Sequence, residues 1–68
     1  MEINFILNGE KRSILKKTSI KNLLDKLDIK LNKVAIEINY EIININDIEK
    51  IFINDGDKVE IVHFIGGG

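Results

Sequence analysis

The sequence contains no cysteine, no proline and no tryptophan, and it has a single histidine. Without cysteine the chain can form neither disulfides nor thiolate metal sites, and it has no thiol nucleophile of its own. A lone histidine among scattered carboxylates gives no metal-ligand spacing, so we expect no bound metal. The 68 residues suffice for one small domain. Its stability must come from a well-ordered apolar core, for which isoleucine, leucine and valine are abundant.

Neither sign of charge dominates, because ten lysines and arginines are balanced by eleven aspartates and glutamates. This balance argues against nucleic-acid binding through a basic patch. The densest basic stretch, EKRSILKK, is either a solvated strand face or a docking patch for an acidic partner. Its cationic residues are Lys11, Arg12, Lys16 and Lys17.

Long apolar runs are also missing. The N-terminus has no basic region followed by an unbroken apolar stretch, so we expect no signal peptide. No segment approaches the roughly 20 apolar residues of a membrane helix, so we expect no membrane partner. A cytoplasmic location is the expectation that remains.

Period-two patterns predict an N-terminal hairpin. INFIL, residues 3–7, alternates with β-branched and aromatic residues on one side, as a strand does. Asn8-Gly9 follows, and this pair is typical of a type I′ turn, which needs positive φ at both central residues. A second strand should run over about residues 11–16, with Ile14 facing the core.

The pattern then changes to the period of a helix. Thr18 or Ser19 can supply the N-cap oxygen, and Lys21 can pair with Asp25 across one turn. The apolar stripe is formed by Ile20, Leu23, Leu24 and Leu27. Such a stripe requires a sheet to cover.

The second half of the chain predicts further strands joined by turns. VAIEI, residues 34–38, returns to period two and should be a strand. Asn39-Tyr40 then makes a turn, and EII is a short further strand. NDIEKIFI, residues 46–53, is expected to form one helical turn capped by Asn46 or Asp47. NDGD is a turn centred on Gly56, and KVEIVHFI is the last strand.

The expected order is therefore a hairpin, a helix, a strand, small elements and a final strand. A helix packed on one face of a mixed sheet of four to five strands is an α+β two-layer domain. We expect this domain to cover residues 1–65, followed by a flexible glycine tail at residues 66–68.

The outward face of the last strand is a candidate partner surface. Alternation places Val62 and Phe64 opposite to Val59, so the first two face outward if Val59 faces the helix. Ile6 on the first strand is expected to join them. Grouped, exposed apolar side chains often mark a binding site. The alternative is that the loop of residues 48–51 covers this half of the sheet.

The glycine tail is the strongest functional feature. No P-loop, dinucleotide fingerprint or HExxH motif is present, and the chain is expected not to be an enzyme. The α-carboxylate of Gly68 becomes open to attack once an ATP-using partner adenylates it. Gly66, Gly67 and Gly68 extend about 10 Å, and without Cβ atoms they fit a narrow channel. The alternative is an inert linker or frayed end.

The closing residues VEIVHFIGGG resemble the C-terminal signature of the ThiS family, sulfur carrier proteins of thiamine biosynthesis. The segments NGE, TSIKNLLDKL and VAIEIN precede them in the family's order, so the resemblance covers the whole chain. It implies the ubiquitin-like β-grasp fold, which agrees with the order of elements given above. Tyr40 departs from the family, whose members often have glycine in this turn.

The resemblance implies specific partners. An E1-like (ThiF-like) adenylyltransferase would activate Gly68 with ATP, and a donor such as a cysteine desulfurase would supply sulfur for a thiocarboxylate. A ThiG-like thiazole synthase would then take the sulfur for the thiazole ring. The chain itself would bind no cofactor. The implied contacts with the partner enzymes, besides Gly68 and Ile6, are Val62, Phe64, Ile65, Gly66 and Gly67.

Three other interpretations stay open. The small sulfur-carrier subunit of molybdopterin synthase shares the chemistry up to the thiocarboxylate and differs in the acceptor. A protein-conjugating modifier would end with Gly68 on a lysine of its target. A ubiquitin-like interaction domain with an inert tail would use no terminal chemistry.

Overall fold

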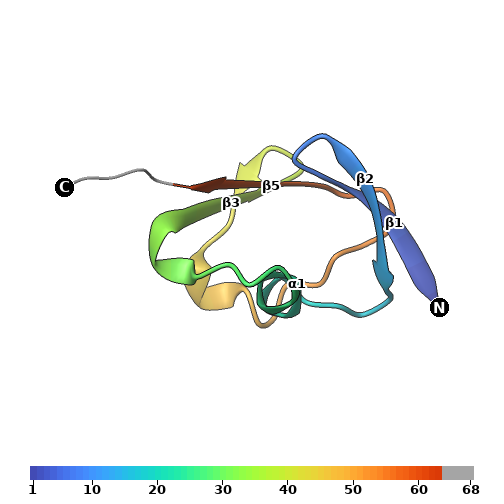
Figure 1. Ribbon diagram of the computed structural model, residues 1–68, viewed down its shortest axis with the longest axis horizontal. Helices are drawn as coiled ribbons and strands as arrows, with labels where there is room; N and C mark the ends of the chain where they lie inside the picture. Colours follow the sequence, from blue (N-terminus) through green and yellow to red (C-terminus); the bar gives the residue numbers. More distant parts are fainter. Residues whose placement is uncertain (64–68) are drawn as a thin grey trace.

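The computed structural model describes residues 1–63, except for the side chain of Lys33. A twisted sheet forms one layer, and a short helix with the longer loops forms the other (Figure 1). The elements in chain order are β1 (Glu2–Leu7), β2 (Glu10–Leu15), α1 (Ile20–Lys26), the 3-10 helix η1 (Leu31–Lys33), β3 (Val34–Ile38), β4 (Glu41–Ile42), the 3-10 helix η2 (Ile45–Asp47) and β5 (Lys58–His63). The expected α+β class is confirmed.

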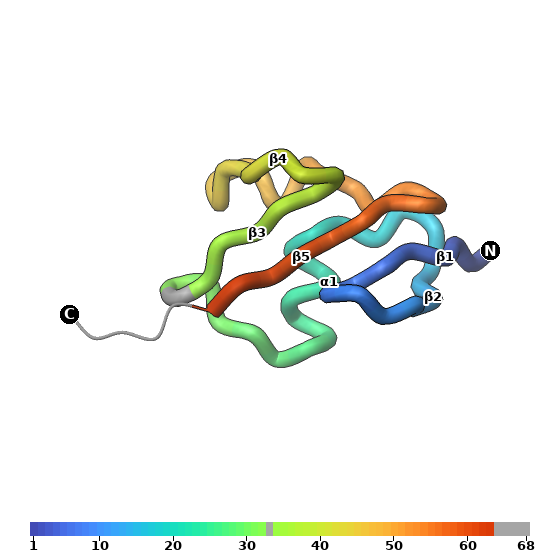
Figure 2. Tube along the Cα trace, turned by 90° about the horizontal axis from the view of Figure 1, so that it is seen from above, coloured from blue at the N-terminus to red at the C-terminus, as the bar shows by residue number. Residues whose placement is uncertain are grey.

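The sheet has five strands in the order β2-β1-β5-β3-β4. β1 and β5 pair in parallel, whereas the other three pairs are antiparallel. Figure 2 shows β5 running between β1 and β3 across the middle of the sheet. The last strand is therefore the central one, and it is held by a neighbour on each side.

The hairpin forms as its turn residues predict. Asn8 and Gly9 both have positive φ, at 49° and 85°, as a type I′ turn requires. β2 begins at Glu10, one residue before the expected start. Ile14 is its buried residue, as predicted.

Helix α1 begins directly after one of the two predicted N-cap residues. Ser19 is the N-cap, and its hydroxyl accepts a hydrogen bond of 3.1 Å from the backbone N–H of Asn22. Thr18, the other candidate, instead donates its hydroxyl to the carbonyl of Leu15 at 2.6 Å. The predicted ion pair between Lys21 and Asp25 is present at 2.8 Å.

The core lies between α1 and the inner face of the sheet. The period-two and helical patterns located its members on the strands and on α1, whereas Ile48 and Ile53 lie in loops and were not predicted to be core residues. The buried hydrophobic residues are Ile3, Phe5, Leu7, Ile14, Ile20, Leu23, Leu24, Val34, Ile36, Ile48, Ile53, Val59 and Ile61. Leu27 and Ile38, also expected to face inward, are partly buried against them.

A second hairpin joins β3 to β4 through Asn39 and Tyr40. Both residues have positive φ, at 52° and 72°, so the predicted turn is confirmed. The side chain of Asn39 also accepts a hydrogen bond from the backbone N–H of Lys58 at 3.0 Å and donates to Asp57 at 3.1 Å. The turn is thereby tied to the start of β5.

The predicted helical turn of residues 46–53 was wrong in its limits and its cap. Helix η2 spans Ile45–Asp47, and Asn44 caps it by accepting a 2.8 Å hydrogen bond from the N–H of Asn46. The chain after it packs Ile48 into the core and pairs Phe52 with Ser19 in an isolated bridge. One further turn follows, in which the N–H of Lys50 donates to the carbonyl of Asp47 at 2.9 Å. The pairing of Phe52 with Ser19 then requires extended backbone, so the predicted helical turn could not reach residue 53.

Candidate functional site

The side of the sheet that points away from α1 is the candidate site, and we call it the outer face. Strand alternation and the pairing register assign its members across all five strands. They include Asn4, Ile6, Lys11, Ser13, Ala35, Glu37, Ile42, Lys58, Glu60 and Val62. Figure 1 shows α1 and the chain around η2 together on the opposite side of the sheet. No described helix covers the outer face.

Val62 lies on the outer face near the end of β5. It pairs with Ala35 of β3, and 48% of its surface is exposed. The loop that was the alternative cover turns inward, because Ile48 is buried beside α1 with 3% exposure. The predicted orientation of Val62 is thus confirmed. Its role as a partner contact stays a prediction.

Two glutamates lie next to Val62 on this face. Glu37 of β3 and Glu60 of β5 are directly opposite each other in the antiparallel register. Like charges in this arrangement destabilise a sheet. Within residues 1–63 the only ion pair joins Lys21 to Asp25, so neither glutamate is neutralised by a salt bridge there. This part of the face therefore favours a cationic group brought by a partner.

Lys58 borders the glutamates at the start of β5. Its Nζ donates a hydrogen bond of 2.6 Å to Tyr40 Oη and lies 5.0 Å from the centre of the tyrosine ring. The hydrogen bond to Tyr40 raises the pKa of Lys58 above its ordinary value, and the negative charge of Glu60 adds to the rise. Tyr40 in the turn is therefore the main cause of the raised Lys58 pKa, and Glu60 of the acidic pair is a smaller one.

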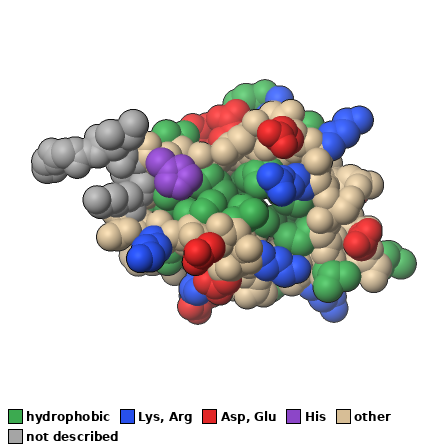
Figure 3. All heavy atoms as spheres, in the orientation of Figure 1, with side chains coloured by type: hydrophobic (Ala, Val, Ile, Leu, Met, Phe, Trp, Pro, Cys, Tyr) green, Lys and Arg blue, Asp and Glu red, His purple; other side chains and the backbone are tan. Residues whose placement is uncertain are grey.

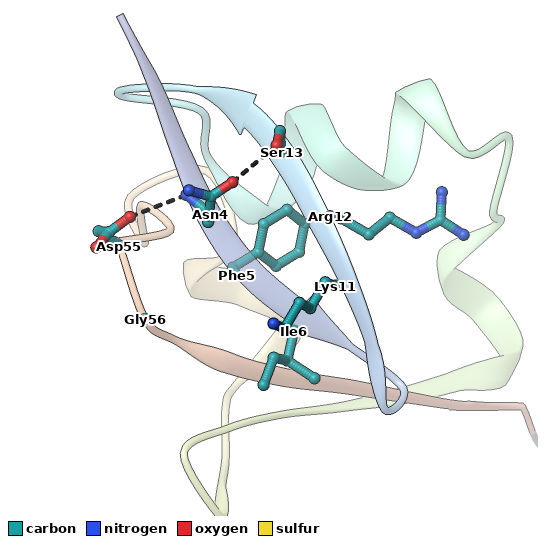
Figure 4. Close-up of a pocket in the computed structure, with 8 residues that line it drawn as sticks. All are labelled: Asn4, Phe5, Ile6, Lys11, Arg12, Ser13, Asp55 and Gly56. Carbon is teal, nitrogen blue, oxygen red and sulfur yellow. Dashed lines mark hydrogen bonds between the residues drawn. The ribbon is translucent and has the colours of Figure 1, made fainter.

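Ile6 lies on the outer face but not beside Val62. It pairs with Lys58, four residues before Val62 along β5, which corresponds to roughly 13 Å of strand. Ile6 lines a shallow groove of about 530 Å³ between the first hairpin and the turn at Gly56 (Figure 4). Three of its polar residues bond one another, since Ser13 donates to Asn4 at 2.8 Å and the Asn4 N–H donates to Asp55 at 2.9 Å. Lys11 and Arg12, which also line it, are exposed. The groove is suited to contact rather than catalysis.

The four basic residues of the first hairpin region are all exposed. Two of them, Lys16 and Lys17, border a second, more apolar groove of about 510 Å³ that is lined also by Met1 and Phe52. This groove lies at the N-terminal end of β1, whereas β5 ends at the other side of the molecule (Figure 1). In the space-filling view, charged side chains are scattered around the apolar ones rather than gathered in one field (Figure 3).

Asn8 contacts β5 in a way that the sequence did not predict. Its side-chain oxygen accepts a hydrogen bond of 2.8 Å from the N–H of Ile61, and its side-chain nitrogen donates to the carbonyl of Ile61 at 3.3 Å. The backbone N–H of Asn8 also donates to the carbonyl of Val59 at 2.9 Å. The Asn-Gly pair signalled the turn alone, because these partners lie more than fifty residues away along the chain.

The remaining predicted site residues lie outside the described part of the chain. They are Phe64, Ile65, Gly66, Gly67 and Gly68, and the expected domain boundary at residue 65 falls among them. Among residues 1–63 there is no group of side chains that could hold a metal ion. None of the helices in that range is long and apolar enough to cross a membrane.

Comparisons with known proteins agree on one family. The model of the ThiS family matches residues 5–68. The sulfur carrier protein ThiS of Bacillus subtilis (strain 168) is 38% identical over 63 residues, which cover 91% of this chain and 96% of that protein. A thiazole synthase of Paramagnetospirillum magneticum is 41% identical over 66 residues, which are 97% of this chain but only 20% of the synthase. The chain thus spans about a fifth of that protein's length.

Solved structures share the fold. The crystal structure of the thiamine biosynthesis protein ThiS from Geobacter metallireducens superimposes with a TM-score of 0.83 at 28% identity. The match covers 97% of this chain and 100% of that one. The β-grasp architecture implied by the resemblance is therefore confirmed.

Proposed function

The chain belongs to the ThiS family, the sulfur carrier proteins of thiamine biosynthesis, and from this premise we propose that Gly68 carries the sulfur on its terminal carbonyl. The observation that carries the proposal is a family match that runs to Gly68, together with a sulfur carrier that aligns over 96% of its own length. A carrier needs no catalytic side chains of its own, and the described part of the outer face offers an exposed apolar residue, Val62, beside charged ones.

The chemistry requires activation by a second protein. The Gly68 carboxylate is ionised at neutral pH, because terminal carboxylates have a pKa near 3.5, and an oxide is a poor leaving group. An E1-like enzyme would join the carboxylate to the α-phosphorus of ATP and release pyrophosphate. A persulfide, supplied through a donor such as a cysteine desulfurase, would then displace AMP and leave an acyl disulfide between Gly68 and the donor. A second thiol would reduce this bond, which leaves the thiocarboxylate on Gly68 and a disulfide between the thiol and the donor. Because the activation consumes ATP, we place it in the cytoplasm.

Thiazole synthase is the proposed acceptor of the sulfur. The thiazole synthase of P. magneticum includes a segment that is 41% identical to nearly all of this chain. One polypeptide there joins the two kinds of protein, and this supports the same pair acting together when they are separate chains. The thiocarboxylate sulfur would pass from Gly68 into the thiazole ring.

The outer face beside the end of β5 is the proposed docking surface. Val62 supplies exposed apolar area, and Glu37 with Glu60 supplies unpaired negative charge within the described residues. A partner surface with an apolar centre and a nearby arginine or lysine would match both features. Charge complementarity of this kind chiefly sets the rate and the register of docking.

Intact mass spectrometry tests the proposal. The protein is incubated with ATP, a sulfur source and the E1-like enzyme from the same cell, and we expect a mass gain equal to one oxygen replaced by sulfur. A variant lacking Gly68 should show no gain and should melt at nearly the same temperature as the full chain.

A matched control separates chemistry from folding. A variant with Gly56→Ala keeps the tail and strains an exposed turn, where φ is +86° and no atom beyond the two chain neighbours lies within 4 Å of an added Cβ. It should still gain sulfur. If the full chain gives neither the mass gain nor a trapped adenylate, the carrier function is ruled out and an inert-tailed interaction domain becomes the better interpretation.

A further inference from the structure

β5 extends beyond the strand that pairs with it on one side. The parallel register of β1 and β5 ends at Leu7 opposite Val59, but β5 continues to His63. On its other side β3 accompanies it to the end, with Val34 opposite His63. The last four residues of β5 therefore have a neighbouring strand on one edge alone.

The side chain of Asn8 takes the place of the missing strand. Its amide accepts from the N–H of Ile61 at 2.8 Å and donates to the carbonyl of the same residue at 3.3 Å. Together with the bond from the Asn8 N–H to Val59 at 2.9 Å, this repeats the spacing of a parallel ladder. We call this pair of side-chain bonds the Asn8 clamp.

An asparagine is well suited to both tasks at this position. The turn requires positive φ, which is 49° at Asn8, and asparagine is among the residues that tolerate it. The clamp requires one donor and one acceptor on the same planar group, and the short amide side chain of asparagine provides both without a charge. Aspartate would offer two acceptors to Ile61, and serine would be too short to reach both atoms.

We infer that Asn8 is a positioning residue for the terminal chemistry: its clamp holds the end of β5 on its open edge and so fixes the direction in which the chain leaves the domain toward Gly68. The inference rests on the proposed function, because direction matters only if an enzyme must receive Gly68 while docked on the same domain. Ordering the end of β5 in advance lowers the entropy that binding must remove.

Replacing Asn8 with glycine tests the clamp. Asn8→Gly keeps a residue that adopts positive φ freely, so the turn survives while both side-chain bonds disappear. One such bond typically changes an equilibrium constant about two- to tenfold. We expect the KM of the carrier in the adenylation reaction to rise about tenfold, with kcat changed less than twofold. Asn8→Asp, which keeps the acceptor for the Ile61 N–H, should rescue part of the loss.

Gly9→Ala is the matched control. It strains the same turn, because φ at Gly9 is +85°, yet no atom beyond its two chain neighbours lies within 4 Å of the added Cβ. The Asn8 side chain is retained in this variant. It should lower the melting temperature at least as much as Asn8→Gly and leave KM unchanged. Amide hydrogen exchange at Ile61 should accelerate about tenfold in Asn8→Gly and stay at the wild-type rate in Gly9→Ala.

The outcomes separate this inference from the proposed function. If wild-type protein is adenylated and Asn8→Gly has the same KM, the positioning role is refuted while the carrier function stands. A KM that rises equally in Gly9→Ala would also refute it, because turn stability rather than the clamp would then be responsible. If the wild-type chain is not adenylated at all, both proposals fall together.

Discussion

Asn8 and Asn39 each open a hairpin turn and also bond to β5. Asn8 holds Ile61, and Asn39 accepts from the N–H of Lys58 while donating to Asp57. Both have positive φ, a conformation in which asparagine is several-fold enriched. Two asparagines, Asn8 and Asn39, thus hold β5 by side-chain hydrogen bonds, one toward its end and one at its start.

Tyr40 contributes to its turn through both its backbone and its hydroxyl group. Its backbone has φ 72°, unusual for a bulky residue, and its hydroxyl accepts from Lys58 Nζ at 2.6 Å. Because this bond raises the pKa of Lys58, Tyr40→Phe should return that pKa toward its ordinary value. An NMR titration of the Lys58 side chain measures it directly.

The sign of the pH effect follows from the raised pKa. The folded state binds the Lys58 proton more tightly than the unfolded state does, so the stabilisation is fully present below the unfolded pKa, near 10.4. It is lost as the pH rises through the folded pKa. Wild type and Tyr40→Phe should therefore converge in stability once the pH has risen through the raised Lys58 pKa of the folded state. An unchanged Lys58 titration in the variant would contradict the assignment.

Helix α1 illustrates what an element requires from its surroundings. It has seven residues, whereas isolated helices below roughly 12 residues are marginal in water. Its stability must come from the cap at Ser19 and from the buried residues Ile20, Leu23 and Leu24. The cap is the part that a single substitution removes without opening a cavity.

Ser19→Ala should therefore lower the free energy of unfolding by about 1 kcal/mol. Lys21→Ala is the control on the same helix: it removes the exposed ion pair with Asp25, which is worth only a few tenths of a kcal/mol. Urea unfolding of both variants measures the difference. Equal losses would mean that the Ser19 hydroxyl does not cap the helix.

Elements with a clear period could be predicted from the sequence, and the short ones could not. Alternation over five or six residues located β1, β3 and β5, and the i, i+3, i+4 stripe located α1. Helices η1 and η2 have three residues each, too few to show any period. The cap of η2 was assigned to the wrong residue because several asparagines and aspartates surround Asn44 and each can cap a turn.

The arrangement of the whole molecule was less predictable than its parts. The parallel pairing of β1 with β5 joins the two ends of the chain, and no local pattern encodes such a partner. The exposure of Val62 followed from alternation once the inner face was known. The contact between Asn8 and Ile61 did not, because it depends on the register of strands 53 residues apart.

The two faces of the sheet should respond differently to truncation. Ile36 is completely buried on the inner face, so Ile36→Ala should cost about 2–5 kcal/mol. That is a large share of the roughly 3–10 kcal/mol expected for a domain of this size. Val62→Ala on the outer face should change the unfolding free energy by less than about 1 kcal/mol and raise the KM with the activating enzyme.

Thermal unfolding and adenylation assays on both variants check this division. A large loss of stability in Val62→Ala would show that the residue is part of the core rather than of a contact surface. Unchanged adenylation kinetics in Val62→Ala would show that Val62 is not part of the docking surface.

The central place of β5 has a mechanical meaning. If a partner draws on Gly68, as the proposed function implies, the pull reaches the domain through β5. This strand is bonded to β3 along its length and to β1 at Lys58 and Val59. A force along β5 loads its hydrogen bonds to the neighbouring strands in shear, so these bonds must break together. An edge strand pulled away from the sheet would instead lose its hydrogen bonds one at a time. The domain can thus stay folded under a pulling force while Gly68 reacts in the site of a partner enzyme.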